Sequence, residues 1–251
     1  MKDADKHMRR ILRRVGENEF LLMLDFDGVL APIVARPHMA RMRKRTRTLL
    51  AACRGRGRVA VISGRALADV RTRVGLSDLW YAGNHGAEWR MGKARGREKL
   101  SRAQGAKLRE AREDFFELSQ RYRGVIVEDK GLTFSVHFRA LARRRAARFK
   151  KDAESISKKF AHLLDISEGA EYIFNIRLRA GRTKDSAVRL ARKSAPAKAV
   201  PIYIGDDTTD ENAFRALKRG ITIRVGKSAS SAAEYYFKTR ASVDRFLRSL
   251  A

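Results

Sequence analysis

Short apolar runs alternate with amphipathic stretches at both ends of this 251-residue chain. The runs are continuously apolar, which is typical of strands that are buried on both faces of a parallel sheet. We predict strands over 20–24, 59–62, 79–82, 200–204 and 221–225. The stretches between them have helical spacing over 40–52, 65–74, 184–193 and 211–219. This alternation predicts an α/β fold with a doubly wound parallel sheet.

The middle of the chain follows a different pattern. A long charged amphipathic stretch at 103–122 precedes two short strands, 125–128 and 132–139, and the turn residues 129–131 lie between them. A second long helix over 140–162 and a strand over 172–176 complete an α+β unit. We therefore predict a core domain formed by residues 1–89 plus 181–251, and an inserted α+β cap domain at 90–180.

Two clusters of carboxylates follow predicted core strands. Asp25 and Asp27 come directly after strand 20–24, and a second group, 206–211, follows strand 200–204. Because open sheets present such residues at the carboxyl ends of their strands, we expect up to five acidic groups around one pocket. Neighbouring carboxylates repel each other unless a hard cation relieves them, so the pattern predicts a Mg²⁺ site. Helix capping by either cluster is the alternative interpretation.

Two smaller signals accompany these carboxylates. Ser63 and Gly64 end strand 59–62, where a hydroxyl could hydrogen-bond a phosphoryl oxygen. Lys184 opens a helix before the last acidic strand, where a cation could neutralise charge on transfer. Each has a simpler interpretation, since Ser63 could cap a helix and one lysine means little in so basic a chain. Their order and their placement at strand ends make them candidates.

The four motifs in this order, Asp-x-Asp-Gly, Ser-Gly-Arg, Lys and Gly-Asp-Asp-x-Thr-Asp, resemble the haloacid-dehalogenase (HAD) superfamily of phosphohydrolases. From Phe20 onward the chain is similar, more narrowly, to trehalose-6-phosphate phosphatases. The motifs that carry this narrower resemblance are Tyr81-Ala82-Gly83-Asn84-His85-Gly86, Val127-Glu128-Asp129-Lys130, Ser135-Val136-His137-Phe138-Arg139, Tyr203-Ile204-Gly205-Asp206-Asp207-Thr208-Thr209-Asp210-Glu211 and Ala213-Phe214-Arg215-Ala216-Leu217.

The resemblance implies a HAD-like core and a magnesium-dependent phosphatase that converts trehalose 6-phosphate into trehalose and phosphate. It implies that Asp25 is the nucleophile and that Asp27 acts as general acid and then base. It also implies that magnesium is held by Asp25, the backbone carbonyl of Asp27 and Asp206, with Asp210 in support. The residues implied around the phosphoryl group are Ser63, Gly64 and Lys184.

For sugar recognition the resemblance points mainly to the cap. The implied substrate-binding residues are His85, Glu128, Lys130, His137, Arg139 and Asn175. Alternation within 132–139 independently puts His137 and Arg139 on one polar face, which could instead be a solvated sheet face.

The chain departs from the family pattern at three places. Val29 stands where the family usually has Thr, and Asn175-Ile176-Arg177-Leu178 stands where Glu-Ile-Arg-Pro is common. Arg182-Thr183-Lys184-Asp185 keeps only the lysine of the usual Trp-Asp-Lys-Gly. These departures leave open a phosphatase for another glycosyl phosphate, such as sucrose phosphate or glucosylglycerate phosphate.

Composition adds a large excess of positive charge. The 56 Lys and Arg residues against 28 Asp and Glu residues give a net charge of +28. Such a surface attracts phosphates, nucleic acid or anionic lipid. A nucleic-acid partner is nevertheless not favoured, because the basic residues spread over most of the length and the acidic pocket would repel a polyanion. A basic polyanion-binding protein on a HAD scaffold is the alternative from a different class.

The remaining features concern location. The single cysteine, Cys53, fits a reducing compartment. The first residues lack the apolar run of a secretory signal, and no stretch approaches the ~18 apolar residues of a membrane helix. We therefore expect a cytoplasmic monomer that acts on a small phosphosugar and has no membrane partner.

Overall fold

The computed structural model describes residues 1–169 and 172–251, which divide into two compact units. Met1–Arg97 and Arg182–Ala251 form the first unit, which we call the core, and Glu98–Gly181 form the second, which we call the cap. The sequence places the first division after residue 89, eight residues before the observed one. The difference arises because the segment 88–97 forms a hairpin that pairs with the core sheet.

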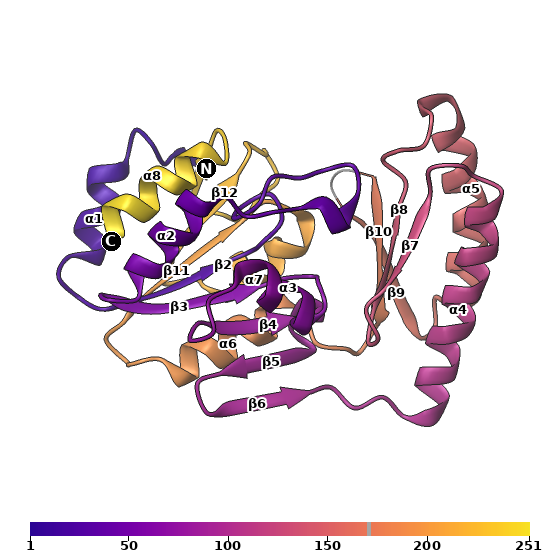
Figure 1. Ribbon diagram of the computed structural model, residues 1–251, viewed down its shortest axis with the longest axis horizontal. Helices are drawn as coiled ribbons and strands as arrows, with labels where there is room; N and C mark the ends of the chain where they lie inside the picture. The colour runs from indigo at the N-terminus through magenta and orange to yellow at the C-terminus, as the bar shows by residue number, and fades with distance from the viewer. Residues whose placement is uncertain (170–171) are drawn as a thin grey trace. The chain divides into compact units, whose positions relative to one another are not determined.

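The core is built on a mostly parallel sheet with the strand order β1-β13-β12-β11-β2-β3-β4-β5-β6 (Figure 1). Its central strand β2 pairs in parallel with β11 on one side and with β3 on the other, so the carboxyl ends of all three meet at one edge. The strands are β1 (Lys2–Asp3), β2 (Phe20–Leu24), β3 (Gly57–Ile62), β4 (Trp80–Gly83), β5 (Glu88–Met91), β6 (Ala94–Arg97), β11 (Val200–Gly205), β12 (Ile221–Val225) and β13 (Tyr235–Phe237).

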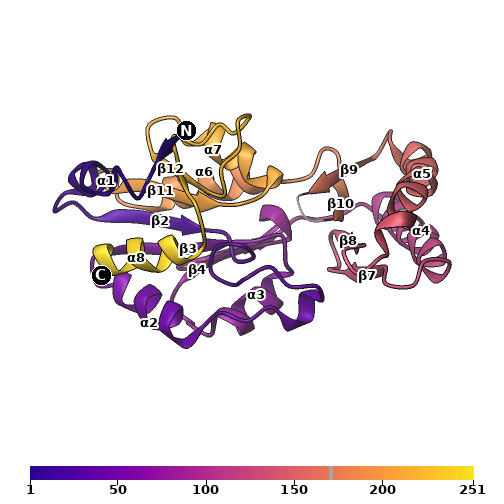
Figure 2. The ribbon, with the colours of Figure 1, turned by 90° about the horizontal axis from the view of Figure 1, so that it is seen from above.

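Helices cover both faces of this sheet, which confirms the predicted doubly wound arrangement. Figure 2 shows α2, α3 and α8 on one side and α6 and α7 on the other. The side chains of β2 alternate between the two layers: Leu22 and Leu24 pack in the first and Leu21 and Met23 in the second, all fully buried. The core helices are α1 (Met8–Val15), α2 (Lys44–Cys53), α3 (Leu67–Val74), α6 (Lys184–Ser194), α7 (Glu211–Ala216) and α8 (Ala241–Leu250).

The cap is an antiparallel sheet with the order β7-β8-β10-β9, and α4 and α5 cover one of its faces (Figure 1). Phe115, Phe134 and Phe149 are among the fully buried side chains between the two layers. The predicted hairpin is confirmed by the pairing of β7 with β8. The cap elements are α4 (Arg102–Gln120), β7 (Ile126–Asp129), β8 (Phe134–His137), α5 (Arg143–Phe160), β9 (Leu164–Gly169) and β10 (Ile173–Leu178).

The sequence interpretation missed the strands β1, β5, β6, β9 and β13. It placed no strand at β9, although Leu164 and Ile166 alternate with polar residues, because the helix was extended to residue 162. It also missed β5 and β6, since the second of these, Ala94–Arg97, is polar and has no apolar alternation. Pairing with β10 stabilises β9, and pairing with β4 stabilises the β5–β6 hairpin. The residues of these strands do not by themselves indicate such pairing.

The lengths and compositions of the helices bear on whether any of them could cross a membrane. Among the helices within 1–169 and 172–251, none combines the length and the apolar character that crossing a bilayer requires.

Candidate active site

Asp25 lies at the carboxyl end of β2, where its backbone N–H donates to the carbonyl of Ile204 on β11. Only 5% of this residue is exposed. Lys184 Nζ, at the first turn of α6, donates to Asp25 Oδ2 over 2.6 Å. Burial raises the pKa of Asp25 to about 7; the charge of Lys184 opposes this shift and the charge of Asp210 adds to it. Asp25 is therefore a buried carboxylate with one cation in contact.

Asp210 is a fully buried carboxylate with every acceptor position used. Its Oδ1 accepts from Lys184 Nζ at 2.7 Å and from the Tyr203 hydroxyl at 2.6 Å. Its Oδ2 accepts from the backbone N–H groups of Asp206 and Asp207, both at 3.0 Å. A carboxylate offers about four lone pairs, so Asp210 orients Lys184 and the loop after β11 and has little capacity left for a direct ligand.

Lys184 stays charged in this environment. Burial alone would lower its pKa, but contacts with Asp210 and Asp25 outweigh that effect and raise it. The buried ammonium is thus held between two carboxylates, one from β2 and one from the 3-10 turn Thr208–Asp210. The positive charge of one buried lysine therefore has to compensate the negative charge of more than one carboxylate.

The surplus negative charge falls on Asp206. Its carboxylate accepts no hydrogen bond from the residues that the structure describes, whereas one oxygen each of Asp25, Asp206 and Asp210 lies within 4.8 Å of the others. Burial and the charge of Asp25 raise the pKa of Asp206 well above its usual value. An unsatisfied, partly buried carboxylate beside Asp25 fits a divalent cation with oxygen ligands. Asp25 and Asp206 are the side chains best placed to hold it.

Gly28 fixes the position of Asp206. Its φ of +71° is left-handed, and a Cβ at this position would stand 1.9 Å from Asp206 Oδ2. The glycine therefore does more than permit the turn after Asp27. It also leaves the space that the Asp206 carboxylate occupies.

Asp27 points toward Arg65. Arg65 Nε and Nη2 donate to Asp27 Oδ2 and Oδ1, both over 2.7 Å, in a bidentate pair. The same guanidinium donates to Asp69 Oδ2 and to the carbonyl of Pro37, and it lies over the ring of Phe26. Arg65 is almost fully buried, whereas 39% of the Asp27 side chain is exposed. Asp27 is thus oriented by one arginine on the loop after β3.

Arg65 and Tyr203 appear in the sequence analysis only as members of motifs, without a role of their own. A signal existed for each. Arg65 precedes Asp69 and Arg73 at helical i, i+4 spacing, which is typical of a charge network. Tyr203 carries the single hydroxyl of the apolar strand β11, and a buried tyrosine hydroxyl needs a hydrogen-bond partner.

Ser63, Gly64 and His85 are brought together by a strained turn. Asn84 and His85 both have left-handed backbones, with φ of +49° and +55°. His85 N–H donates to the Ser63 carbonyl, and its ring packs so closely on Gly64 that a Cβ there would meet it at 2.5 Å. Positive φ at non-glycine residues is uncommon and is often found at functional sites. The fully buried Ser63 hydroxyl lies in this turn and accepts from Arg65 N–H.

The cap collects the remaining candidates on the sheet face away from its helices. Strand register puts Glu128, Ser135 and Asn175 side by side across β7, β8 and β10. Lys130 Nζ donates to Ser135 Oγ at 2.6 Å, and Ser135 Oγ donates to Asn175 Oδ1 at 3.1 Å. His137 Nε2 lies 2.8 Å from Glu128 Oε2. Arg139, the last candidate, follows β8.

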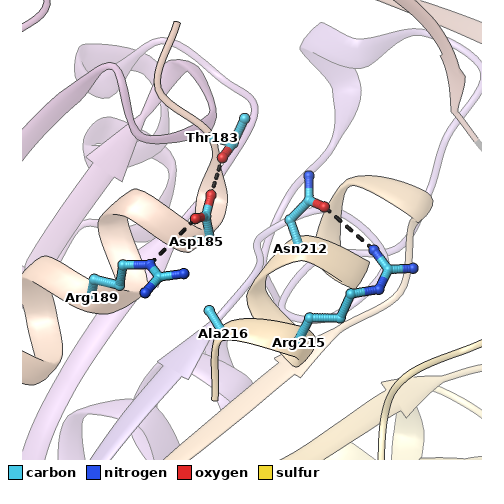
Figure 3. Close-up of a pocket in the computed structure, with 6 residues that line it drawn as sticks. All are labelled: Thr183, Asp185, Arg189, Asn212, Arg215 and Ala216. Atoms are coloured by element: carbon cyan, nitrogen blue, oxygen red, sulfur yellow. Dashed lines mark hydrogen bonds and ion pairs between the residues drawn. The ribbon is translucent and has the colours of Figure 1, made fainter. Parts of the chain in front are cut away.

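A cavity of about 350 Å³ lies beside α6 and α7 in the core (Figure 3). Arg189 Nε is 3.5 Å from Asp185 Oδ2, and Arg215 Nη1 donates to Asn212 Oδ1. Figure 3 shows that Arg189 and Arg215 come from different helices beside the cavity, and that each guanidinium group contacts its own partner. The lining of the cavity includes the two sequence neighbours of Lys184 but none of Asp25, Asp206 and Asp210. Its lining residues are Thr183, Asp185, Arg189, Asn212, Arg215 and Ala216.

Comparison with known proteins gives a consistent result. The family model described as trehalose-phosphatase matches residues 23–242. Trehalose-phosphate phosphatase of Mycobacterium tuberculosis (strain H37Rv) is 35% identical over 199 residues, covering 77% of this chain and 50% of the relative. Probable trehalose-phosphate phosphatase I of Arabidopsis thaliana is 30% identical, covering 98% of this chain and 71% of the relative. The chain spans about half the length of the mycobacterial relatives it matches.

The solved structures agree on the fold. The C-terminal domain of Candida albicans trehalose-6-phosphate phosphatase superimposes with a TM-score of 0.84 at 18% identity, covering 96% of this chain and 95% of that one. With further matches to HAD-superfamily phosphatases, this confirms the predicted HAD-like fold class.

Replacing Gly28 with Ala tests the role of the space beside Asp206. We expect Gly28→Ala to bind a divalent cation, with Mg²⁺ as the probe, at least about tenfold more weakly in isothermal titration, because the added Cβ would displace the Asp206 carboxylate. Gly226→Ala is the matched control: φ there is +87°, but no atom lies within 4 Å of a Cβ. Both variants carry left-handed strain of ~1–2 kcal/mol. Equal cation affinity in the two variants would contradict the steric role of Gly28.

Cation affinity should also depend on pH. Because the pKa of Asp25 is raised to about 7, a proton competes with the cation below neutral pH. With Mg²⁺ as the probe cation, we expect affinity to rise by about tenfold or more from pH 6 to pH 8, and binding at pH 6 to release protons. Titration in buffers of different ionisation enthalpy measures both quantities. An affinity that stays constant over this range is the contrary result.

Proposed function

The chain belongs to the trehalose-phosphatase family, and from this premise we propose that it hydrolyses trehalose 6-phosphate to trehalose and inorganic phosphate. The observation that carries the proposal is the buried contact of Asp25 with Lys184, beside the unsatisfied carboxylate of Asp206. A carboxylate in this setting can attack phosphorus, while the lysine neutralises charge on the phosphoryl oxygens.

We propose Mg²⁺ as the cofactor because the available ligands are all hard oxygens. Asp25, Asp206 and the backbone carbonyl of Asp27 would hold it, with Asp210 acting through Lys184 and the loop N–H groups. When bound, the cation neutralises and orients the phosphoryl oxygens. All other steps use the chain's own residues.

The reaction proceeds in two displacements at phosphorus. An oxygen of Asp25 attacks, the bond from phosphorus to the sugar oxygen breaks, and Asp27 gives its proton to the departing sugar. Water then attacks the phosphoaspartate, Asp27 takes a proton from it, and phosphate leaves with Asp25 restored. Ser63 and the N–H of Gly64 are positioned by the His85 turn to hydrogen-bond phosphoryl oxygens.

Asp27 can serve both steps only if Arg65 orients it correctly. In the structure both oxygens of Asp27 accept from Arg65, so one must be released before Asp27 carries a proton. We propose that Arg65 orients Asp27 toward the phosphoryl site. When the substrate approaches, one Asp27 oxygen leaves Arg65, takes up a proton from solvent and then gives that proton to the departing sugar oxygen. Arg65 is therefore a positioning residue whose effect depends on how strongly the leaving group needs a proton.

Sugar selection is proposed for the polar row of the cap sheet. Lys130, Ser135 and Asn175 are linked by hydrogen bonds, and Glu128 lies next to Ser135 in register. Hydroxyl groups of a sugar suit such mixed donors and acceptors. Asn175 is an amide where the family commonly has a carboxylate, which keeps another glycosyl phosphate as a second candidate substrate. The monomeric state and cytoplasmic location stay predictions.

Phosphate release from a panel of sugar phosphates tests the function. We expect release from trehalose 6-phosphate with Mg²⁺, none with EDTA, and a loss of about 10⁴-fold or more in Asp25→Asn, which keeps the shape but removes the nucleophile. Asp207→Asn is a control carboxylate outside the three-aspartate cluster. Faster release from sucrose phosphate or glucosylglycerate phosphate would retain the mechanism and change the substrate, and no release from any would reject the proposal.

Substitution of Arg65 tests how Asp27 is positioned. In Arg65→Lys the bidentate contact is lost, so we expect kcat/KM for trehalose 6-phosphate to fall roughly 10²-fold. For 4-nitrophenyl phosphate, whose leaving group needs no proton, kcat/KM should fall less than about threefold. Arg73→Lys is the matched control, because Arg73 also donates to Asp69 but makes no contact with Asp27 among the residues that the structure describes. An equal loss for both substrates would show that Arg65 acts only on the local fold.

A further inference from the structure

The cap carries a dense group of arginines where α4 ends and α5 begins (Figure 1). Although the sequence shows basic residues over most of its length, folding gathers six exposed ones at this end of the helical layer. We call them the arginine cluster, and its members are Arg121, Arg123, Arg143, Arg144, Arg145 and Arg148.

Contacts around Tyr122 bring three of these residues, Arg121, Arg145 and Arg148, close together. Arg145 Nη2 donates to the carbonyl of Arg121 over 2.8 Å, and its guanidinium lies 4.8 Å from the centre of the Tyr122 ring. Arg148 and Arg121 both act electrostatically on the Tyr122 hydroxyl. Gly124 abuts the carbonyl of Ala140, so the chain segments before β7 and before α5 lie side by side. The cluster is therefore one surface made from two parts of the cap.

The positive charge of this surface is left uncompensated by close ion pairs. Within the described part of the chain, the guanidinium groups of Arg121, Arg144 and Arg148 have no hydrogen bond or ion pair. The neighbouring acid, Asp152, is engaged by the Tyr122 hydroxyl. Arg144 and Arg148 are at i, i+4 spacing on α5, where like charges destabilise a helix. An anionic ligand would remove that repulsion.

We propose that the arginine cluster binds the phosphate backbone of double-stranded nucleic acid, without sequence selection. Guanidinium groups match phosphate geometry, and closely spaced phosphates supply the repeated negative charge that six arginines need. This binding site goes beyond the proposed phosphatase function and uses none of its residues.

Other anionic partners fit this surface less well. An amphipathic membrane anchor places large apolar side chains beside its basic ones, but the exposed large hydrophobics of the described chain lie outside 121–124 and 140–148. Protein interfaces usually have an apolar or aromatic centre, which this surface also lacks. Single strands are held by stacking on exposed aromatic rings, whereas Tyr122 is only 3% exposed. A duplex backbone requires charge alone.

Fluorescence anisotropy with a labelled 20-bp DNA duplex of mixed sequence tests the proposal. For six phosphate contacts, log K should fall with log salt with a slope of about −5. The triple variant Arg121→Gln, Arg144→Gln, Arg148→Gln should reduce that slope to about −3 and weaken binding roughly a hundredfold at 0.1 M salt. Glutamine keeps helix propensity close to that of arginine, so the fold should be retained.

A charge-matched control lies on α1 of the core. Arg9, Arg10 and Arg13 are exposed and make no ion pair among the residues described, so their Gln triple variant removes the same charge elsewhere. It should change affinity less than about threefold. Equal losses in the two triple variants, or wild-type protein that does not bind the duplex, would overturn the proposal.

Two controls distinguish a loss of DNA binding from unfolding of the variant and from an effect at the carboxylate site. Circular dichroism and phosphate release check that each triple variant is folded, and the double variant Arg143→Gln, Arg144→Gln replaces the cap triple if it is not. DNA binding should persist unchanged in Asp25→Asn, because the cluster is distinct from the carboxylate site. Loss of binding in that variant would contradict the assignment to the cap.

Discussion

The ammonium group of Lys184, buried between Asp25 and Asp210 at 2.6 and 2.7 Å, is the contact on which the rest of the core site depends. A charge removed from water must be compensated by close partners of opposite sign, or the fold is strongly destabilised. Here the partners come from β2 and from the turn after β11, while the lysine itself begins α6. One ion-pair group therefore ties three separate segments to the same sheet edge.

The carboxylates of Asp210, Asp27 and Asp206 have different partners and therefore different roles. Asp210 is saturated by Lys184, Tyr203 and two backbone N–H groups, so it acts as a fixed support. Asp27 is paired with Arg65 on the exposed side of the motif. Asp206 alone is left without a donor in the described structure, and this imbalance is what makes a cation the natural complement of the site.

The two units place their polar groups by different sheet geometries. In the core, parallel strands carry continuous apolar sequences and leave polar residues at their carboxyl ends. In the cap, antiparallel strands alternate, so Phe134 and Val136 pack against helices while Ser135 lies on the opposite face with Asn175. The proposed phosphoryl chemistry and the proposed sugar recognition thus fall on different kinds of surface.

Much of the fold and the clustering of the central carboxylates could be predicted from local sequence. Buried parallel strands are recognisable because every residue of a run such as Phe20–Leu24 is apolar, and the spacing of Asp25 and Asp27 after that run is itself the motif. The alternation of strands and helices likewise predicted a parallel sheet with helices on both faces. In the cap, the alternation around Phe134 indicated which face would be polar before any contact was known.

Tertiary structure decided the contacts between residues far apart in the chain. Arg65 meets Asp27 across 38 positions and Ser135 meets Asn175 across 40, and neither pair has a local signature. The strand β9 and the gathering of Arg121 with Arg145 likewise depend on which segments pack together. The sequence by itself determined which residues could do chemistry, because side-chain type and periodicity are local properties. Only the folded chain decided their partners, since strand order and register bring distant groups into contact.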